Sequence, residues 1–459
     1  MRKFFYVMLL SIFVLSPFSF VQADQPAMTF EQPTYKTEVK VKLLPTKIIS
    51  TNFFGKYAVK DFETDSWLQI ENITTMSFEF AENKIVAKAN GETFYSSKGF
   101  GLYEQPNEQV NYVEMDSIQQ SSGTSKVKYR GSFSVVPESN SLALYNTLDM
   151  ESYLKGVVPS EMPASWSAEA VKAQAVASRS YAYVQMQRRG VLQMTIASQV
   201  YGGLSREHAL SNAAIDATSG IYAMHTNRPI EAVFHSSSGG FVENSETVWQ
   251  SNVPYLRLKE DPFDKHSSNP HYGWITNINT STIKTNIGLK QNEDLVGLKV
   301  SNKTDGGAVQ QVEATIFDSA SNTISKKPLT VAYPDLFRSF FGGAGSLKST
   351  KFEVNGAAPM KIVRADGTVV TKDFVKGMSL QRRDNSTVVI SQHNVSVRTT
   401  ATNVLLLPTA PLAFTFTGNG WGHGLGLSQW GARGMAEAGF TYEDILKHYY
   451  TGIELKTLD

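Results

Sequence analysis

One glutamate of this 459-residue chain stands between two prolines, in the segment Pro159-Ser160-Glu161-Met162-Pro163. Each proline fixes its own φ and biases the residue before it toward extended backbone, so the sequence predicts a rigid loop that holds this carboxylate in one place. A carboxyl group held in this way can donate a proton and later accept one, which is general acid and base catalysis. The alternative is an ordinary solvated loop glutamate.

A helix is predicted directly after this loop. Residues 168–187 contain no glycine or proline, Ser167 is suited to be the N-cap, and Gly190 is a natural stop. Positions i, i+4, i+7 and i+11 of a helix share one face. On this helix they are Lys172, Val176, Arg179 and Tyr183.

That face places two cations in line on a helix that begins beside Glu161. A solvated charged face is the alternative interpretation, because charged residues are mostly exposed. The residues around Arg179 are small (Ala-Ser-Arg-Ser-Tyr-Ala), which favours close helix packing around its guanidinium.

A second dense segment, residues 418–439, has seven glycines from Gly418 to Gly434. Glycine lets backbone approach a ligand closely. Aromatic faces and polar side chains between the glycines suit a sugar chain, whose apolar faces stack and whose hydroxyls need hydrogen bonds. No Gly-Lys-Ser/Thr sequence follows, which excludes a phosphate loop. The alternative is a tightly packed joint between a strand and a helix. The interleaved residues are Trp421, His423, Ser428, Gln429 and Trp430.

A third segment, Phe234 to Gly240, contains His235 and Ser236. A serine nucleophile is possible there, although the chain has no Gly-x-Ser-x-Gly elbow. Glu231, His235 and His423 could together hold a metal, but the chain has neither cysteine nor a His-Glu-x-x-His pair. We therefore expect no metal and no cofactor.

Composition excludes several classes of protein. The chain has 43 Lys plus Arg and 42 Asp plus Glu, a net charge of +1, which argues against nucleic acid as a partner. The absence of cysteine excludes disulfides and thiol nucleophiles. Residues 1–23 carry a basic start, an apolar run and Val21-Gln22-Ala23, which predicts a signal peptide and a secreted protein. A retained membrane anchor is the alternative.

The remaining pattern predicts a mixed α+β fold. Residues 30–148 and 275–410 read as short strands, and helices are expected at 168–187, 205–218 and 442–450. Four regions follow: a signal peptide (1–23), a β-rich N-terminal region (24–124), a catalytic domain in two pieces (125–354 and 411–459), and a β-rich insertion between them (355–410).

Three of these segments together resemble one family, the stage II sporulation protein D and amidase enhancer family of bacterial cell-wall proteins. They are YLKGVVPSEMPASWSAEAVKAQAVASRSYA (153–182), FHSSSGG with Val248-Trp249, and GNGWGHGLGLSQWGARGMAEAG with YEDILKHYYTGIEL (418–455). The resemblance implies a lytic transglycosylase that cleaves peptidoglycan glycan strands whose stem peptides an amidase has removed.

The resemblance also implies roles for residues. Glu161 becomes the catalytic acid, Lys172 and Arg179 the supporting cations, and Tyr449 or Tyr450 a functional tyrosine. Some members hold zinc through cysteines near the third segment, where this chain has Ser237 and Ser238. The residues we expect to bind substrate are His235, Ser236, Trp421, His423, Ser428 and Gln429.

A lytic transglycosylase needs only one carboxyl group. The group protonates the glycosidic oxygen and then takes the proton of the C6 hydroxyl of N-acetylmuramic acid, which closes a 1,6-anhydro ring. Burial raises the pKa of such a glutamate, and a nearby cation lowers it. The alternative function is a non-catalytic protein that binds glycan and stimulates an amidase; a serine hydrolase is a third.

Overall fold

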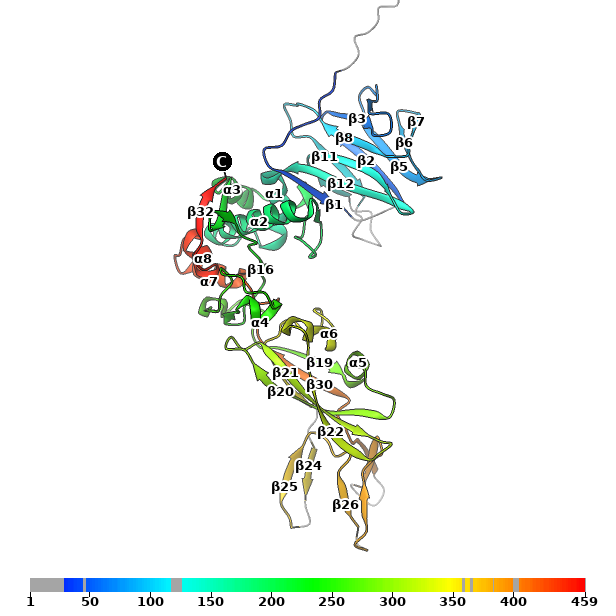
Figure 1. The fold of residues 1–459 in the computed structure, drawn as a ribbon, viewed down its shortest axis with the longest axis vertical. Coiled ribbons are helices and arrows are strands. Elements are labelled where there is room, and N and C mark those ends of the chain that lie inside the picture. Colours follow the sequence, from blue (N-terminus) through cyan, green and yellow to red (C-terminus); the bar gives the residue numbers. More distant parts are fainter. Residues whose placement is uncertain are drawn as a thin grey trace, which may run out of the picture.

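The computed structural model describes residues 29–43, 47–116, 126–356, 360–363, 366–382, 384–398 and 404–458, so the predicted signal peptide lies outside the described residues. Three parts follow one another along the longest axis of the molecule: a β-sandwich, a helical part and a second β part (Figure 1). The fold is α+β, as predicted. No helix within the described residues is long and apolar enough to cross a membrane.

The sandwich contains a seven-stranded and a six-stranded sheet. Side chains alternate between the two faces of a strand, and in the first strand Val39 and Val41 are fully buried while Glu38 and the two lysines face outward. In order, the larger sheet is β13 (Leu192–Gln193), β1 (Glu38–Lys42), β12 (Ser141–Asp149), β11 (Ser132–Glu138), β8 (Phe100–Glu104), β3 (Tyr57–Asp61) and β4 (Ser66–Trp67). The smaller sheet is β10 (Lys126–Tyr129), β9 (Tyr112–Asp116), β2 (Ile48–Phe54), β5 (Thr75–Ala81), β6 (Lys84–Ala89) and β7 (Glu92–Ser96).

The helical part is built around one long helix, α2 (Ala168–Arg189). It follows Ser167 and ends at Gly190, whose φ of 69° is the left-handed conformation of a helix stop, so the predicted helix and its stop are confirmed. Ser167 occupies the N-cap position, but its side chain makes no capping hydrogen bond. The other helices are α1 (Met150–Glu161), α3 (Ala209–Ala217), α4 (Ser245–Trp249), α7 (Gln429–Glu437) and α8 (Tyr442–Tyr449). Short strands complete this part: β14 (Ile221–His225), β15 (Arg228–Pro229), β16 (Phe234–His235), β17 (Phe241–Val242), β18 (Lys259–Glu260), β31 (Leu427–Ser428) and β32 (Glu454–Thr457).

One loop prediction and one helix prediction need correction. The segment before Glu161 is helix α1 and not an extended loop. Pro159 lies in the last turn of this helix and has no N–H to donate to the carbonyl of Lys155, so α1 forms without that backbone bond near its end. The helix predicted at 205–218 is a 3-10 turn (Gly203–Arg206) followed by the shorter α3. The last helix is confirmed with its capping box, in which Thr441 and Asp444 bond each other's backbone.

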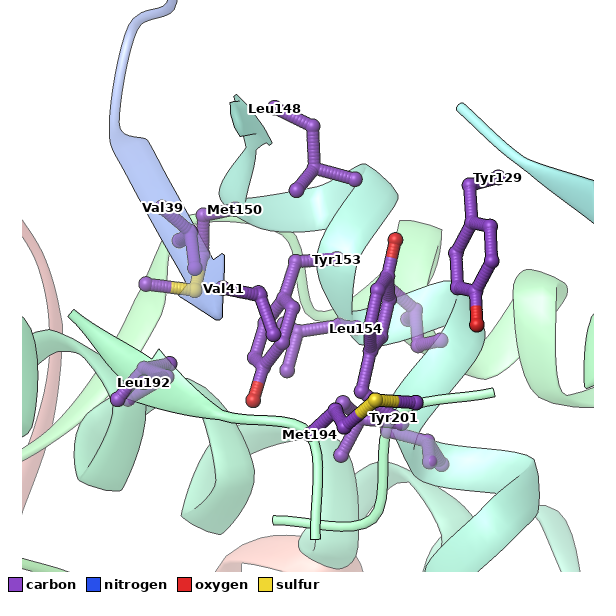
Figure 2. Close-up of a cluster of buried hydrophobic side chains, with 14 of the residues drawn as sticks. Val39, Val41, Tyr129, Leu148, Met150, Tyr153, Leu154, Leu192, Met194 and Tyr201 are labelled. Carbon is purple, nitrogen blue, oxygen red and sulfur yellow. The ribbon is translucent and has the colours of Figure 1, made fainter. Parts of the chain in front are cut away.

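The sandwich and the helical part share one hydrophobic core. Strand β12 runs directly into α1, and Asp149 caps the helix by accepting the N–H of Glu151. At this junction Val39 and Val41 of β1 pack against Tyr153 and Leu154 of α1 (Figure 2). Full burial of an apolar side chain of this size contributes about 1.5–3 kcal/mol, so the sandwich fixes the direction of α1.

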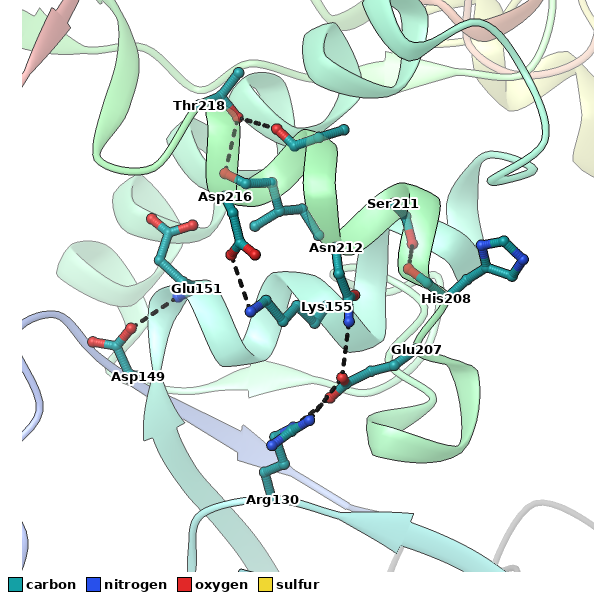
Figure 3. A network of polar contacts seen from close by, with 12 residues as sticks. Arg130, Asp149, Glu151, Lys155, Glu207, His208, Ser211, Asn212, Asp216 and Thr218 are labelled. Carbon is teal, nitrogen blue, oxygen red and sulfur yellow. Dashed lines mark hydrogen bonds and ion pairs between the residues drawn. The ribbon is translucent and has the colours of Figure 1, made fainter. Parts of the chain in front are cut away.

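Polar contacts hold α1 from its other side (Figure 3). Lys155 of α1 pairs with Asp216 of α3 at 3.0 Å. Arg130 donates to both carboxylate oxygens of Glu207, and Asn212 of α3 donates to the same carboxylate. The sandwich, the 3-10 turn and α3 are thereby joined around the helix that ends in Glu161.

The second β part has its own core, in which Phe341, Phe352 and Phe416 are buried together. This core groups residues 274–354 with β30, whereas the predicted boundaries place all of 125–354 in one domain. Its elements are β19 (Trp274–Asn279), α5 (Thr280–Asn286), β20 (Glu293–Lys303), β21 (Val309–Asp318), β22 (Thr323–Leu329), α6 (Phe337–Phe340), β23 (Phe352–Gly356) and β30 (Ala413–Gly418). Three hairpins follow β23: β24 (Met360–Val363) with β25 (Val369–Lys372), β26 (Ser379–Gln381) with β27 (Thr387–Val389), and β28 (Asn394–Arg398) with β29 (Val404–Pro408).

Candidate active site

A pocket of about 470 Å³ is lined by residues of both the helical part and the second β part. Its volume lies in the range of roughly 300–1,000 Å³ that is usual for ligand sites. The lining comes from the end of α1 (Glu161), from α2 (Tyr181), from segments 196–198 and 233–236, from Trp249, and from residues 338, 344, 421–423 and 429. All three segments singled out in the sequence therefore contribute to one pocket.

Glu161 is the one carboxylic acid in this lining. Its Oε1 accepts the backbone N–H of Val200 at 2.7 Å. Burial raises the pKa of Glu161, and the bond from Val200 lowers it by less, so the pKa stays above its ordinary value. Neither Lys172 nor Arg179 is among the groups that shift it, so burial decides the balance that the sequence left open.

The loop that carries Val200 is fixed by two buried tyrosines. Tyr153 of α1 donates to Gln199, next to Val200, at 3.1 Å. On its other side Tyr201 donates to Asn146 of β12 at 2.7 Å. The donor that orients the Glu161 carboxyl is thus held by both α1 and the sandwich.

The two predicted supporting cations have other partners. Arg179 is completely buried and binds Glu151 of α1 with two parallel hydrogen bonds of 2.9 and 2.7 Å, while a third reaches the carbonyl of Ile221. Lys172 pairs with Glu169 at 2.7 Å and lies over the ring of Tyr442. Neither cation lines the pocket. In this structure Arg179 ties α2 to α1, and the close packing predicted around it is present.

The two predicted histidines lie together in the lining, with ring centroids 5.3 Å apart. His423 uses both nitrogens: Nδ1 accepts the N–H of Leu425, and Nε2 donates to the carbonyl of Phe234. His235 donates from Nδ1 to the carbonyl of Leu425, and its Nε2 has no partner. Burial lowers the pKa of His423 to about 4 and that of His235 well below its usual value, so both rings are neutral.

Because Nε2 of His235 is unpartnered, no hydrogen bond joins it to Ser236, as a serine hydrolase would require. Ser236 does line the pocket, and its carbonyl accepts the N–H of Trp430. Glu231, the third residue of the possible metal site, instead bonds Gln185 and Arg188. Among the described residues no three His, Asp or Glu side chains form a group that could hold a metal ion.

The glycine-rich segment both packs and lines the pocket. Trp421 is 42% exposed in the lining and forms a backbone bridge with Ser237. The neighbouring Gly422 has a φ of 119°, and a Cβ there would lie 2.7 Å from the Cβ of His235. Glycine is required at this position by both conformation and space. The tight joint is therefore present, and Trp421 of the same segment lines the pocket.

Ser428 and Gln429 differ in position. Gln429 lines the pocket and donates weakly to Gln174 of α2. Ser428 is fully buried, caps α7 by accepting the N–H of Gly431, and donates to Asp264 at 2.8 Å. Asp264 also accepts the hydroxyl of Ser237. Ser428 and Asp264 thus join the glycine-rich segment to the segment of His235 without lining the pocket.

Tyr449 and Tyr450 are both fully buried. Tyr450 donates to the carbonyl of Val233 at 2.8 Å and supports the pocket wall from behind. The Tyr449 hydroxyl lies in the small space above Gly431, beside the carboxylate of Asp261. Burial and the charge of Asp264 raise the pKa of Asp261 to about 7. Neither tyrosine lines the pocket.

Sequence reasoning missed four residues of this region. Arg338 and Tyr181 line the pocket, and Asp261 and Asp264 anchor its loops. Asp261 carries a usable signal, because an Asp before Pro262 is a common start of a helical turn, and Asp261 does cap one here. Arg338 and Tyr181 carry none, because only folding brings their segments to Glu161.

Comparison with known proteins locates a family domain in the chain. Residues 138–225, which run from the last residue of β11 through β14, match the family model described as stage II sporulation protein. This segment contains Glu161, the Val200 loop and Tyr181, but not the glycine-rich segment or Arg338.

Three relatives extend beyond that domain. The amidase enhancer of Bacillus subtilis (strain 168) is 33% identical over 308 residues, which are 66% of this chain and 40% of that protein. An uncharacterized protein of Brachyspira hyodysenteriae is 26% identical over 423 residues, 91% of this chain and 92% of that one. Stage II sporulation protein D of Bacillus subtilis (strain 168) is 28% identical over 331 residues, which are 68% of this chain and 76% of that protein. This chain therefore spans less than half the length of the amidase enhancer.

Proposed function

Because the chain carries a stage II sporulation protein domain at residues 138–225, we propose that it cleaves the glycan strands of peptidoglycan as a lytic transglycosylase, after the stem peptides have been removed. One observation carries the proposal: among the described residues, the lining of the pocket contains a single carboxylic acid, Glu161. Its carboxyl group is half-buried and oriented by Val200, and its pKa lies above the ordinary value. A general acid must hold its proton near neutral pH, and burial favours that form.

The single carboxyl group serves both halves of the reaction. Oε1 of Glu161 is engaged by Val200, so Oε2 carries the proton to the oxygen that links N-acetylmuramic acid to the next sugar. The bond between that oxygen and C1 breaks. The C6 hydroxyl of the same muramic acid attacks C1, and its proton passes to the Glu161 carboxylate. Glu161 is protonated again at the end, and the product has a 1,6-anhydro ring.

The lining supplies surfaces for a sugar chain. Trp421, Trp249 and Tyr181 offer aromatic faces, on which the apolar face of a sugar stacks. Gln429 and Ser236 offer polar groups for hydroxyls. These five residues come from four separate segments, because Trp421 and Gln429 share the glycine-rich segment, so an intact fold is needed to form the site. The extracytoplasmic location that this substrate requires agrees with the signal peptide predicted at residues 1–23.

A non-catalytic role is the second candidate, because one relative is named an amidase enhancer. In that role the aromatic lining binds glycan and a cell-wall amidase is the partner. Glu161 then serves binding or structure.

One comparison of substrates tests the proposal. The protein is incubated with intact peptidoglycan, with amidase-treated peptidoglycan and with bare glycan strands, and anhydro-ended products are measured by mass spectrometry. We expect products from the treated and bare substrates and few from the intact one. Equal yields from intact and treated peptidoglycan contradict the substrate preference. No product from any substrate, with stimulation of an added amidase, supports the enhancer role instead.

A further inference from the structure

Arg338 is the one cation among the residues that line the pocket. It belongs to α6 in the second β part, outside the segment that matches the family model. Its side chain is only 16% exposed. The lining of the pocket therefore contains an acidic residue from the segment that matches the family model and a basic residue from another part of the chain.

The fold holds Arg338 firmly in place. Phe337 and Phe341, on either side of it in sequence, are fully buried in the core of the second β part. The carbonyl of Arg338 accepts the N–H groups of Phe341 and Gly343 at 3.1 and 2.7 Å. The backbone that carries the guanidinium is thus fixed relative to that core.

One carboxylate orients the guanidinium and leaves donors free. Asp335 pairs with Nη2 of Arg338 at 2.7 Å, and Asp335 does not line the pocket. A guanidinium has five N–H donors, so this pair leaves Nε and Nη1 for a ligand. Arginine is also the side chain best matched to a carboxylate, because its planar fork can bind both oxygens.

The expected substrate carries one carboxylate on each muramic acid. When an amidase cleaves the bond between the lactyl group and the stem peptide, it leaves a free lactyl carboxylate on C3. In intact peptidoglycan the same position is a neutral amide. This muramic acid is the sugar whose C1 reacts at Glu161, so its lactyl group lies in or beside the same pocket.

We propose that Arg338 binds the lactyl carboxylate of the muramic acid and so selects glycan that an amidase has already processed. This inference rests on the proposed function. The other titratable groups of the lining do not compete for the lactyl carboxylate: His235 and His423 are neutral, and Glu161 and Tyr181 carry no positive charge.

A matched pair of ligands tests the contact. Bare glycan strands are compared with the same strands after carbodiimide coupling to methylamine, which turns each lactyl carboxylate into a neutral amide. Binding is measured by calorimetry to the full-length Glu161→Gln protein, so that cleavage does not consume the strands. A hydrogen bond to a charged group contributes about 1.5–3 kcal/mol, so we expect the amide strands to bind roughly 10- to 150-fold more weakly.

Substitution of Arg338 in the same background should remove this preference. Arg338→Gln should bind the two ligands equally, and Arg338→Lys should keep part of the difference. Lys326→Gln is the control, since it removes the same charge from an exposed side chain of the second β part. A thermal melt of each variant establishes that it is folded.

The outcomes separate this inference from the proposed function. If Arg338→Gln keeps the full preference while the Arg338-intact enzyme produces anhydro ends, the Arg338 contact is wrong and the function stands. If the enzyme produces no anhydro ends from any glycan while the preference exists and is lost with Arg338, the contact stands and the catalytic function is wrong.

Discussion

Replacing Arg179 should lower the stability of the protein, and it should not act directly on the cleavage reaction. Its guanidinium is completely buried and makes two hydrogen bonds to Glu151, whose side chain is 24% exposed. Glu151 Oε1 also accepts the N–H of Gly220. Arg179→Ala leaves this carboxylate without its cation and opens space between α1 and α2.

The size of the stability loss follows from the Glu151 carboxylate, which Arg179→Ala leaves without its cation. Removing one partner of a buried ion pair costs about 3–5 kcal/mol, and the partial exposure of Glu151 places the loss at about 3 kcal/mol. For a domain of 150–250 residues each kcal/mol lowers the melting temperature by roughly 2–4 °C, so we expect a fall of about 6–12 °C.

The assay is a thermal melt of the wild type, Arg179→Ala and Glu151→Gln, with cleavage of bare glycan measured well below each melting temperature. Glu151→Gln should also destabilise the protein, because it breaks the same pair from the other side. Lys172→Ala, which removes a half-exposed pair with Glu169, should change stability by no more than about 1 kcal/mol.

A different result would refute this assignment. If Arg179→Ala melts with the wild type and yet loses cleavage, Arg179 acts on substrate directly, as the family resemblance implies. If Glu151→Gln leaves both stability and cleavage unchanged, the pair does not hold α1 and α2 together.

Three further predictions concern other parts of the site. Because burial raises the pKa of Glu161 and the reaction begins with its protonated form, kcat/KM should be highest below that pKa and fall as pH rises through it; a rate that rises over the same range would contradict the acid role. Gly431→Ala places a Cβ 1.9 Å from the Tyr449 hydroxyl and 2.5 Å from Asp261, so it should lower stability by at least about 1–3 kcal/mol in a denaturation series, whereas Gly345→Ala, which meets nothing within 4 Å, should be neutral. Chelators should leave cleavage unchanged, and a loss in EDTA that zinc restores would show that His235 and His423 hold a metal after all.

Local patterns in the sequence were enough to predict the best-defined helices. The end of α2 at Gly190 and the start of α8 at Thr441 were predictable because capping depends on residues close in sequence. Ser167 does precede the first residue of α2, but its side chain makes no capping hydrogen bond. The same reasoning failed for α1. Pro159 and Pro163 suggested extended backbone, but the sequence alone does not show that Tyr153, Leu154 and the sandwich bury a helix there.

The candidate site was predictable only in part. Glu161, Trp421 and His423 stood out through unusual local sequence, and the pocket brings them together. Arg338 could not be found this way, because residues 177 positions beyond Glu161 reach the pocket only through the packing of a separate core. Arg179 was singled out correctly as a packed cation, but its partner Glu151 lies on a helix that the sequence did not predict.

The most direct test of the central claim is the yield of 1,6-anhydro ends from bare glycan strands, measured by mass spectrometry for the wild type and for Glu161→Gln. Gln nearly keeps the shape of Glu and can still approach Val200, but it neither donates nor takes up the catalytic proton. We predict anhydro ends with the wild type and a loss of at least about 100-fold with Glu161→Gln, at an unchanged melting temperature. Anhydro ends formed at the wild-type rate by Glu161→Gln would contradict the account.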